Sequence, residues 1–266
     1  MDYFEKDKFF LYQTIDSTNS ELMRCLNQAG SLLNTDGTLT DKGKSLHKSV
    51  AAAFEQSAGR GRMGRPFFSP AKSGVYFSFI YIPQGGVREP SHYTITSAVG
   101  VCRAIKELYK RECGIKWVND IYLRGKKICG ILTEGLSNPV NGLVEAAVVG
   151  IGINISLKNN LPPELEGKAG GILEEGEESS VSKETFIQQC IEEIFKSLDT
   201  KENIIEEYKG RSMLTGKSVR VTPLIGSNRD AYLAKVLGIT DDAGLEVEDE
   251  KGKVRILHSG EVTLHS

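Results

Sequence analysis

The chain of 266 residues lacks the long hydrophobic runs of membrane proteins. Its longest apolar stretch, residues 142–155, is too short to span a bilayer and contains Glu145. Residues 1–7 carry too many charges for a signal peptide, and we expect none. The sequence therefore predicts a soluble cytoplasmic protein that does not bind membranes.

Cysteine and histidine are few and scattered. The five cysteines include no C-x-x-C pair and no histidine at metal-ligand spacing, which argues against a zinc site. An odd number of scattered thiols fits a reducing compartment better than a disulfide framework. The four histidines stand apart from every motif below. We therefore expect neither a metal held by the protein nor a side-chain nucleophile.

The chain also lacks an excess of positive charge. Its 33 basic and 35 acidic residues give a formal net charge of −2. Nucleic-acid-binding domains are usually strongly basic, so no nucleic-acid partner is expected and any basic site must be local. The hydrophobic content of 39% is ordinary for a globular protein, and the length allows a buried core without disulfides.

Apolar periodicity divides the chain into a long mixed region and a short β region. Helical spacing predicts helices over 18–28, 90–113, 182–198 and 204–208. Strands are expected over 9–15, 49–54, 74–82, 115–118, 127–134 and 143–155. The 115–118 and 127–134 strands should form a hairpin around Arg124-Gly125, and 30–48 should be an exposed connection with a helical turn near its end.

After Gly216 the pattern changes to short alternating strands. They are expected over 218–222, 231–239, 245–248, 254–258 and 261–264, with turn residues between them. Five such strands predict a small β-barrel. We therefore expect two domains, residues 1–212 and residues 213–266.

The strongest candidate site is the segment from Gln56 to Arg65, which places Arg60, Arg62 and Arg65 among three glycines. Glycines let the backbone approach a ligand closely, and arginines supply forked donors for carboxylate or phosphate. The segment also matches the dinucleotide pattern G-x-G-x-x-G. That pattern must open a helix, and the prolines that follow argue against one. A mobile basic surface loop is the remaining alternative.

A second candidate site combines Lys116-Trp117-Val118-Asn119-Asp120 with Lys127. Asn119 and Asp120 are expected at a strand end, where an amide can read a base edge and a carboxylate can bind magnesium or steer an amine. The ammonium of Lys127 could meet a carboxylate and a phosphate together. Turn chemistry and a solvated strand edge explain these residues equally well.

Two further segments carry polar groups beside tight backbone. Gly150-Ile151-Gly152-Ile153-Asn154 ends a buried strand, and its glycines suggest a ligand pressed against backbone or a bulge. Ser17-Thr18-Asn19 precedes a helix; Thr18 and Glu21 have capping-box spacing. The four segments together suggest a site for a nucleotide and an acid, where positioning and charge stabilisation supply the chemistry.

The combined motifs resemble those of biotin protein ligases. The Gly-Arg-Gly-Arg-x-Gly-Arg segment after Gln56 is similar to the family's biotin-binding loop. Lys-Trp-x-Asn-Asp, with Lys127 seven residues after Asp120, is similar to its second motif. Gly-x-Gly-Ile-Asn and the early Ser-Thr-Asn follow the family's order, and the C-terminal β region resembles its SH3-like domain. The resemblance covers nearly the whole chain.

The resemblance implies a fold and a two-step reaction. The fold would be α+β, a class II synthetase-like mixed, largely antiparallel sheet with helices, plus a small C-terminal SH3-like β-barrel. Biotin and ATP with Mg²⁺ would give biotinyl-adenylate and pyrophosphate. A lysine of a biotin carboxyl carrier protein, an acyl-CoA carboxylase subunit, would then take the biotin and release AMP.

The resemblance also assigns roles by position. Lys127, Arg60 and Asp120 would be catalytic, with Asp120 positioning magnesium or the incoming lysine. Biotin would be bound by Ser17, Thr18, Asn19, Gln56, Gly59, Arg60, Gly61, Arg62 and Lys127. The nucleotide would be bound by Arg62, Arg65, Phe67, Asn119, Gly130 and Asn154.

The sequence departs from the family pattern at several positions. Val118 stands where proline is usual, and Pro66-Phe67 replaces Lys-Trp, so Phe67 would supply any aromatic contact to adenine. The 30–48 connection looks longer than usual. No helix-turn-helix module precedes the catalytic region, so DNA binding and repressor activity are not expected.

Three other functions are compatible with parts of this pattern. A lipoate-attaching enzyme of similar fold is the nearest, and the arginine loop and C-terminal barrel favour biotin over it. A biotin-sensing regulator would bind biotin and leave the carrier protein unmodified. Nucleic-acid binding through the arginine loop is disfavoured by the net charge and by the few aromatic residues beside that loop. The family includes monomers and dimers, so a homodimer is left open.

Overall fold

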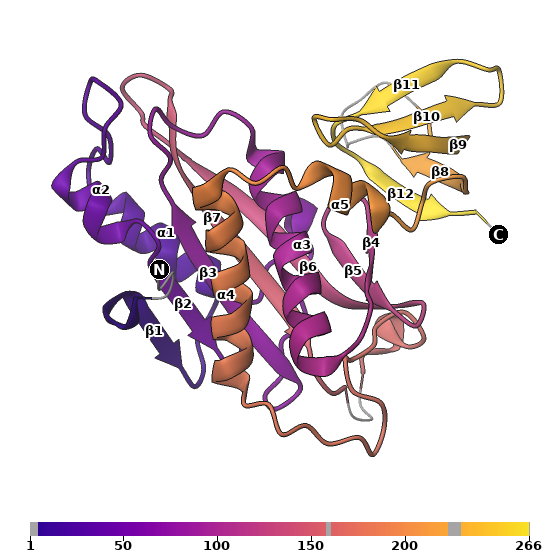
Figure 1. Ribbon diagram of the computed structural model, residues 1–266, viewed down its shortest axis with the longest axis horizontal. Helices are drawn as coiled ribbons and strands as arrows, with labels where there is room; N and C mark the ends of the chain where they lie inside the picture. Colours follow the sequence, from indigo (N-terminus) through magenta and orange to yellow (C-terminus); the bar gives the residue numbers. More distant parts are fainter. Residues whose placement is uncertain (1–4, 158–160, 223–229, 266) are drawn as a thin grey trace.

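The computed structural model describes residues 5–157, 161–222 and 230–265, and its largest element is a seven-stranded sheet (Figure 1). The strands lie in the order β1-β2-β3-β7-β6-β5-β4. Among these strands only β1 and β2 pair in parallel. Their bounds are β1 (Phe9–Tyr12), β2 (Val50–Ala53), β3 (Gly74–Tyr81), β4 (Gly114–Lys116), β5 (Asp120–Leu123), β6 (Lys126–Ser137) and β7 (Val144–Asn154).

Helices cover both faces of this sheet. They are α1 (Thr18–Asn27), α2 (Asp41–Leu46), α3 (Pro90–Tyr109), α4 (Lys183–Thr200) and α5 (Ile205–Gly210), with short 3₁₀ turns at Lys6–Lys8, Arg62–Gly64 and Pro163–Leu165. Figure 1 shows α3 and α4 side by side across one face. No helix in the described part of the chain is both long and apolar enough to pass through a bilayer.

The central strands are buried on both faces because successive side chains alternate between them. Phe77 and Phe79 of β3 belong to the core that includes α3 and α4, and the Phe79 ring meets the Phe195 ring edge-on at 5.2 Å. Ile80 and Val148 face the other way, into a cluster with Leu22 and other residues of α1. On the α1 face, a pocket lies over the first half of β6 and the second half of β7, and it is the candidate site.

The C-terminal region forms a second, five-stranded antiparallel sheet in the order β11-β10-β9-β8-β12. The strands are β8 (Ser218–Thr222), β9 (Tyr232–Ile239), β10 (Leu245–Asp249), β11 (Val254–Leu257) and β12 (Glu261–Leu264). β11 and β12 are its two edges, so the described part of the predicted barrel is an open sheet. The α+β class with a largely antiparallel main sheet and a small C-terminal β unit is confirmed.

The predicted hairpin of 115–118 with 127–134 is wrong. The turn at Arg124-Gly125 joins β5 to β6, and a separate turn at Trp117–Asn119 joins β4 to β5. β5 was missed because four residues are too few to display a period. Asp120 is consequently the first residue of β5 rather than part of the hairpin turn.

Two other boundaries differ from prediction. Ser17, rather than Thr18, caps α1, because its side chain accepts a hydrogen bond from Ser20 N. α3 ends at Tyr109, where Lys110 adopts a left-handed conformation that stops the helix four residues before the predicted end.

The 30–48 connection is not simply an exposed loop. Leu32 and Leu33 are buried in the α1-side core. The buried carboxylate of Glu145 accepts hydrogen bonds from Leu32 N at 2.8 Å and Ser31 Oγ at 3.0 Å. Hydrogen bonds and apolar burial therefore hold the start of this connection against β7.

Candidate functional site

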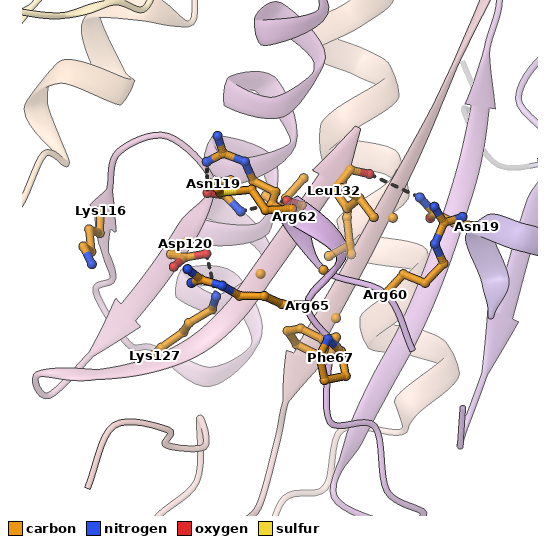
Figure 2. A pocket seen from close by; sticks show the side chains of 18 of the residues that line it. Asn19, Arg60, Arg62, Arg65, Phe67, Lys116, Asn119, Asp120, Lys127 and Leu132 are labelled. Atoms are coloured by element: carbon orange, nitrogen blue, oxygen red, sulfur yellow. Dashed lines mark hydrogen bonds and ion pairs between the residues drawn. The ribbon is translucent and has the colours of Figure 1, made fainter. Parts of the chain in front are cut away.

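The sequence-predicted segments meet in one pocket on the α1 face of the main sheet. Its walls come from the start of α1, the arginine loop, the β4–β5 turn, β6, β7 and the start of β12 (Figure 2). The predicted site residues that line it are Ser17, Thr18, Asn19, Gln56, Arg60, Gly61, Arg62, Arg65, Phe67, Asn119, Asp120, Lys127 and Gly130.

One end of the pocket is a buried, mostly uncharged hydrogen-bond network, which we call the neutral end (Thr18, Asn19, Gln56 and Ser78). Gln56 Oε1 accepts from Thr18 N at 2.9 Å, and Ser78 Oγ donates to Asn19 Oδ1 at 2.5 Å. Asn19 Nδ2 donates to Glu134 Oε2 at 2.9 Å. Thr18 and Asn19 are each only 3% exposed. Because every member is held by another, the network is formed before any ligand arrives.

Glycines of the sheet make room for two of these pocket side chains. A Cβ at Gly150 would lie 2.0 Å from Asn19 Oδ1, and one at Gly152 would lie 2.3 Å from the Phe67 ring. β3 and β7 pair in continuous register past both glycines, so a bulge does not explain them. The close approach to the backbone that the glycines predict is made by the protein's own side chains, Asn19 and Phe67.

The other end of the pocket is charged, and we call it the charged end (Arg62, Arg65, Lys116, Asp120, Lys127 and Glu261). Lys127 Nζ lies 2.7 Å from Asp120 Oδ1, and Arg65 Nη2 lies 2.5 Å from Glu261 Oε2. Arg62 Nη1 donates to Asn119 Oδ1 at 3.0 Å.

The two ends are joined through Glu134. Arg60 Nη2 contacts Glu134 Oε1 at 2.7 Å, and the other oxygen of this carboxylate accepts from Asn19. The loop that carries the arginines is thereby tied to the neutral end.

Three charged groups here have shifted pKa values, and that of Arg65 is raised by its hydrogen bond to Glu261. The ion pair with Arg65 holds the pKa of Glu261 below its ordinary value, outweighing partial burial. Burial lowers the pKa of Lys116, and the nearby Lys127 acts in the same direction, whereas Asp120 and Glu261 oppose it. The Glu261 carboxylate therefore stays ionised, and the Lys116 ammonium is partly desolvated.

Contacts from three parts of the chain fix the β4–β5 turn. Trp117 Nε1 donates to Ala243 O in the β9–β10 turn at 2.8 Å, and Tyr208 OH of α5 donates to Val118 O at 2.9 Å. Asn119 Nδ2 donates to Ile131 O of β6 at 2.9 Å. The turn that presents Asn119 thus depends on three separate parts of the chain.

Two predicted site residues do not line the pocket. Gly59 is buried behind it, where a Cβ would lie 2.4 Å from Phe67 O, so this glycine permits the loop to close on itself. Asn154 is 8% exposed at the end of β7, and its carbonyl accepts from Ile172 N. Their predicted ligand contacts remain proposals.

Sequence reasoning also missed residues that shape the pocket. They are Lys116, Trp117, Glu134, Ser78 and Glu261. Lys116 and Trp117 stood inside a quoted motif without a role. Ser78 and Glu261 carry no local signal, because only strand pairing and the approach of the C-terminal sheet bring them to the site.

Comparison with known proteins agrees with this arrangement. Residues 35–154 match the Biotin/lipoate A/B protein ligase family. This stretch of the chain is a domain of that family. The bifunctional ligase/repressor BirA of Bacillus subtilis is 30% identical over 221 residues, which cover 81% of this chain and 66% of that protein. Thus the chain matches only about two thirds of that relative's length.

The chain matches a larger share of two other relatives. The biotin–[acetyl-CoA-carboxylase] ligase of Mycobacterium tuberculosis is 26% identical over 253 residues, covering 92% of this chain and 85% of that protein. The structure of the Aquifex aeolicus biotin protein ligase in complex with biotin and ATP superposes with a TM-score of 0.73. It is 22% identical and covers 97% of this chain and 98% of that chain, which shows a shared fold.

Proposed function

We propose that this protein adenylates biotin with ATP and transfers the biotin to a lysine of a biotin carboxyl carrier protein. The observation that carries the proposal is the pocket's division: a neutral network at one end, and Arg62, Arg65 and Lys127 at the other. The named activities of the family members above support it. We place the reaction in the cytoplasm and assign it to residues 1–212, with residues 213–266 as an attached domain.

The charged end suits the first step. Bringing a carboxylate to an ATP phosphate opposes like charges, which costs on the order of 4 kcal/mol per unit pair at contact distance near a protein surface. Lys127 would offset this repulsion and would stabilise the charge on the α-phosphate in the transition state. Arg60 and Arg62 would hold the carboxylate and the phosphate and order the loop over the anhydride.

The neutral end favours biotin over lipoate. Biotin's ureido ring carries N–H donors and a carbonyl acceptor, whereas the dithiolane ring of lipoate carries neither. A pocket end of hydroxyls and amides can exchange hydrogen bonds with the first, whereas a dithiolane offers these groups no hydrogen-bond partner. Thr18, Asn19 and Gln56 are the proposed ring contacts.

Asp120 and magnesium have supporting roles in the proposal. Magnesium enters with ATP and is normally held by one or two carboxylates together with phosphates and water. Asp120 and Glu261 are the carboxylates at the charged end, and each is now paired with a cation. Once Lys127 turns to the substrate, Asp120 is released to hold the ion or to orient the carrier's amine.

A carrier-labelling assay tests the proposal. Purified protein, biotin, MgATP and a biotin carboxyl carrier domain should give a carrier modified by biotin on one lysine, detected by intact mass. Omitting ATP or replacing the target lysine by arginine should abolish the product. Tight biotin binding with an unmodified carrier would contradict ligation and identify a sensor; labelling with lipoate but not biotin would reassign the substrate.

A further inference from the structure

The ammonium of Lys116 differs from the other cations of the pocket. Arg60, Arg65 and Lys127 each form an ion pair, and Arg62 forms a hydrogen bond. Within the described chain, the Lys116 side chain lines the pocket and makes no ion pair or hydrogen bond of its own. It is half-buried as well. An ammonium that is partly desolvated and unpaired gains more from an incoming anion than one that must first leave a carboxylate.

Its position follows from strand register. Lys116 of β4 pairs with Asp120 of β5, Asp120 pairs with Gly130 of β6, and Gly130 pairs with Gly152 of β7. These residues form one row across the pocket face of the sheet. Three strand spacings, about 14 Å, separate the ends of this row. Asn19 lies over Gly150 of β7, at the opposite end of the pocket, and Figure 2 shows Lys116 beyond Asp120 and far from Asn19.

The geometry of the adenylation step indicates which group of the substrate lies at the Lys116 end of the pocket. A biotin carboxylate oxygen forms a bond to the α-phosphorus while the bond from that phosphorus to the bridging oxygen breaks. The bridging oxygen keeps the electron pair and leaves as part of pyrophosphate. Attacking and leaving oxygens lie roughly in line, so pyrophosphate emerges on the side away from biotin. With biotin at the neutral end, that side is the Lys116 side.

We propose that Lys116 binds the pyrophosphate leaving group, and this assignment rests on the function proposed above. Arg65 is its neighbour at this end, but Arg65 must exchange Glu261 for the phosphate. Lys116 captures the β- and γ-phosphates of ATP without breaking an ion pair and stabilises the negative charge that develops as the bond to the α-phosphorus breaks.

Calorimetric titration with inorganic pyrophosphate tests the assignment, with a hydrolysis-resistant sulfamoyl analogue of biotinyl-adenylate as the second ligand. In Lys116→Met the pyrophosphate affinity should fall at least about tenfold, the effect of one charge-assisted hydrogen bond. The affinity for the analogue should change less than about twofold, because the analogue has no leaving group for Lys116 to bind. Lys116→Arg should retain pyrophosphate binding because it keeps the charge.

The matched control is Lys126→Met. Lys126 is an exposed lysine on β6 that does not line the pocket. It should leave both affinities unchanged. The assignment would be overturned if Lys116→Met weakened the binding of pyrophosphate and of the analogue equally, or if it left the pyrophosphate affinity unchanged. The two proposals fail separately: pyrophosphate binding that depends on Lys116 without any biotin binding would refute the ligase function and leave the pyrophosphate site standing.

Discussion

The two ends of the pocket are built from different interactions. At the neutral end, buried hydroxyls and amides hold one another, and Thr18 and Asn19 are almost inaccessible. At the charged end, Arg65 and Lys127 rest on carboxylates of the protein in exposed or half-exposed pairs; the Arg65 side chain is 61% exposed. Exposed ion pairs are worth roughly 0–1 kcal/mol, so a phosphate can replace them easily.

The difference teaches how binding and chemistry are divided. A preformed neutral end can recognise a ring in the absence of nucleotide, because its polar groups need no rearrangement. The charged end must exchange partners, so its contribution appears only when anionic substrates are present. Substitutions at the neutral end should therefore change ligand affinity, and those at the charged end should change rate.

Lys127→Ala should have the largest effect. It removes the ammonium proposed to stabilise the α-phosphate, and loss of one such group typically lowers the rate about 100- to 1000-fold. Biotin-dependent exchange of pyrophosphate into ATP measures it. Lys126→Ala, the exposed neighbour, should retain full exchange, and both variants should unfold at nearly the wild-type temperature. Normal exchange in Lys127→Ala would remove the catalytic assignment.

Gly150→Ala should have the next largest effect, on affinity. The added methyl would overlap the Asn19 side chain, and such overpacking costs roughly 1–3 kcal/mol, or about fivefold to 150-fold in biotin affinity if it falls on the network. Calorimetry with biotin alone measures it. Gly210→Ala, where a Cβ meets nothing within 4 Å, is the matched control. Wild-type affinity in Gly150→Ala would show that the neutral end does not bind biotin.

Arg62→Gly should weaken retention of the adenylate. The change deletes a charged donor that now bonds to Asn119 and adds backbone freedom to the loop. Release should accelerate about tenfold, the effect of one charge-assisted hydrogen bond. Labelling of bystander proteins and adenylate recovered after gel filtration report it. Retention equal to wild type would separate Arg62 from the intermediate.

Trp117→Phe should give the smallest effect and test the role of the C-terminal sheet. It replaces the indole by a smaller aromatic ring and removes the N–H that reaches Ala243 O, at a cost of about 1 kcal/mol for the hydrogen bond. The turnover number should fall about fivefold while biotin affinity stays constant, because the residues that flank the turn, Lys116 and Asp120, belong to the charged end. A fall in biotin affinity with unchanged turnover would show that the turn supports the neutral end rather than the charged end.

The sequence was informative where chemistry and spacing are local. The arginine loop, Lys127 and Asp120 could be grouped because their residue types suit the same anions, and the long strands and helices followed from periodicity. β5 could not be found, since four residues show no period. Ser78 and Glu261 were not visible because strand register and contact with the C-terminal sheet bring them to the site. Gly150 was noticed, but its neighbour Asn19 lies on another element.

The most direct test of the two-ended pocket is calorimetric titration with biotin and with lipoate, each with and without MgATP. The account predicts that biotin binds alone through the neutral end, that MgATP strengthens its binding through the charged end, and that lipoate binds far more weakly in both conditions. Equal affinity for lipoate, or biotin binding that requires MgATP, would contradict a preformed neutral end.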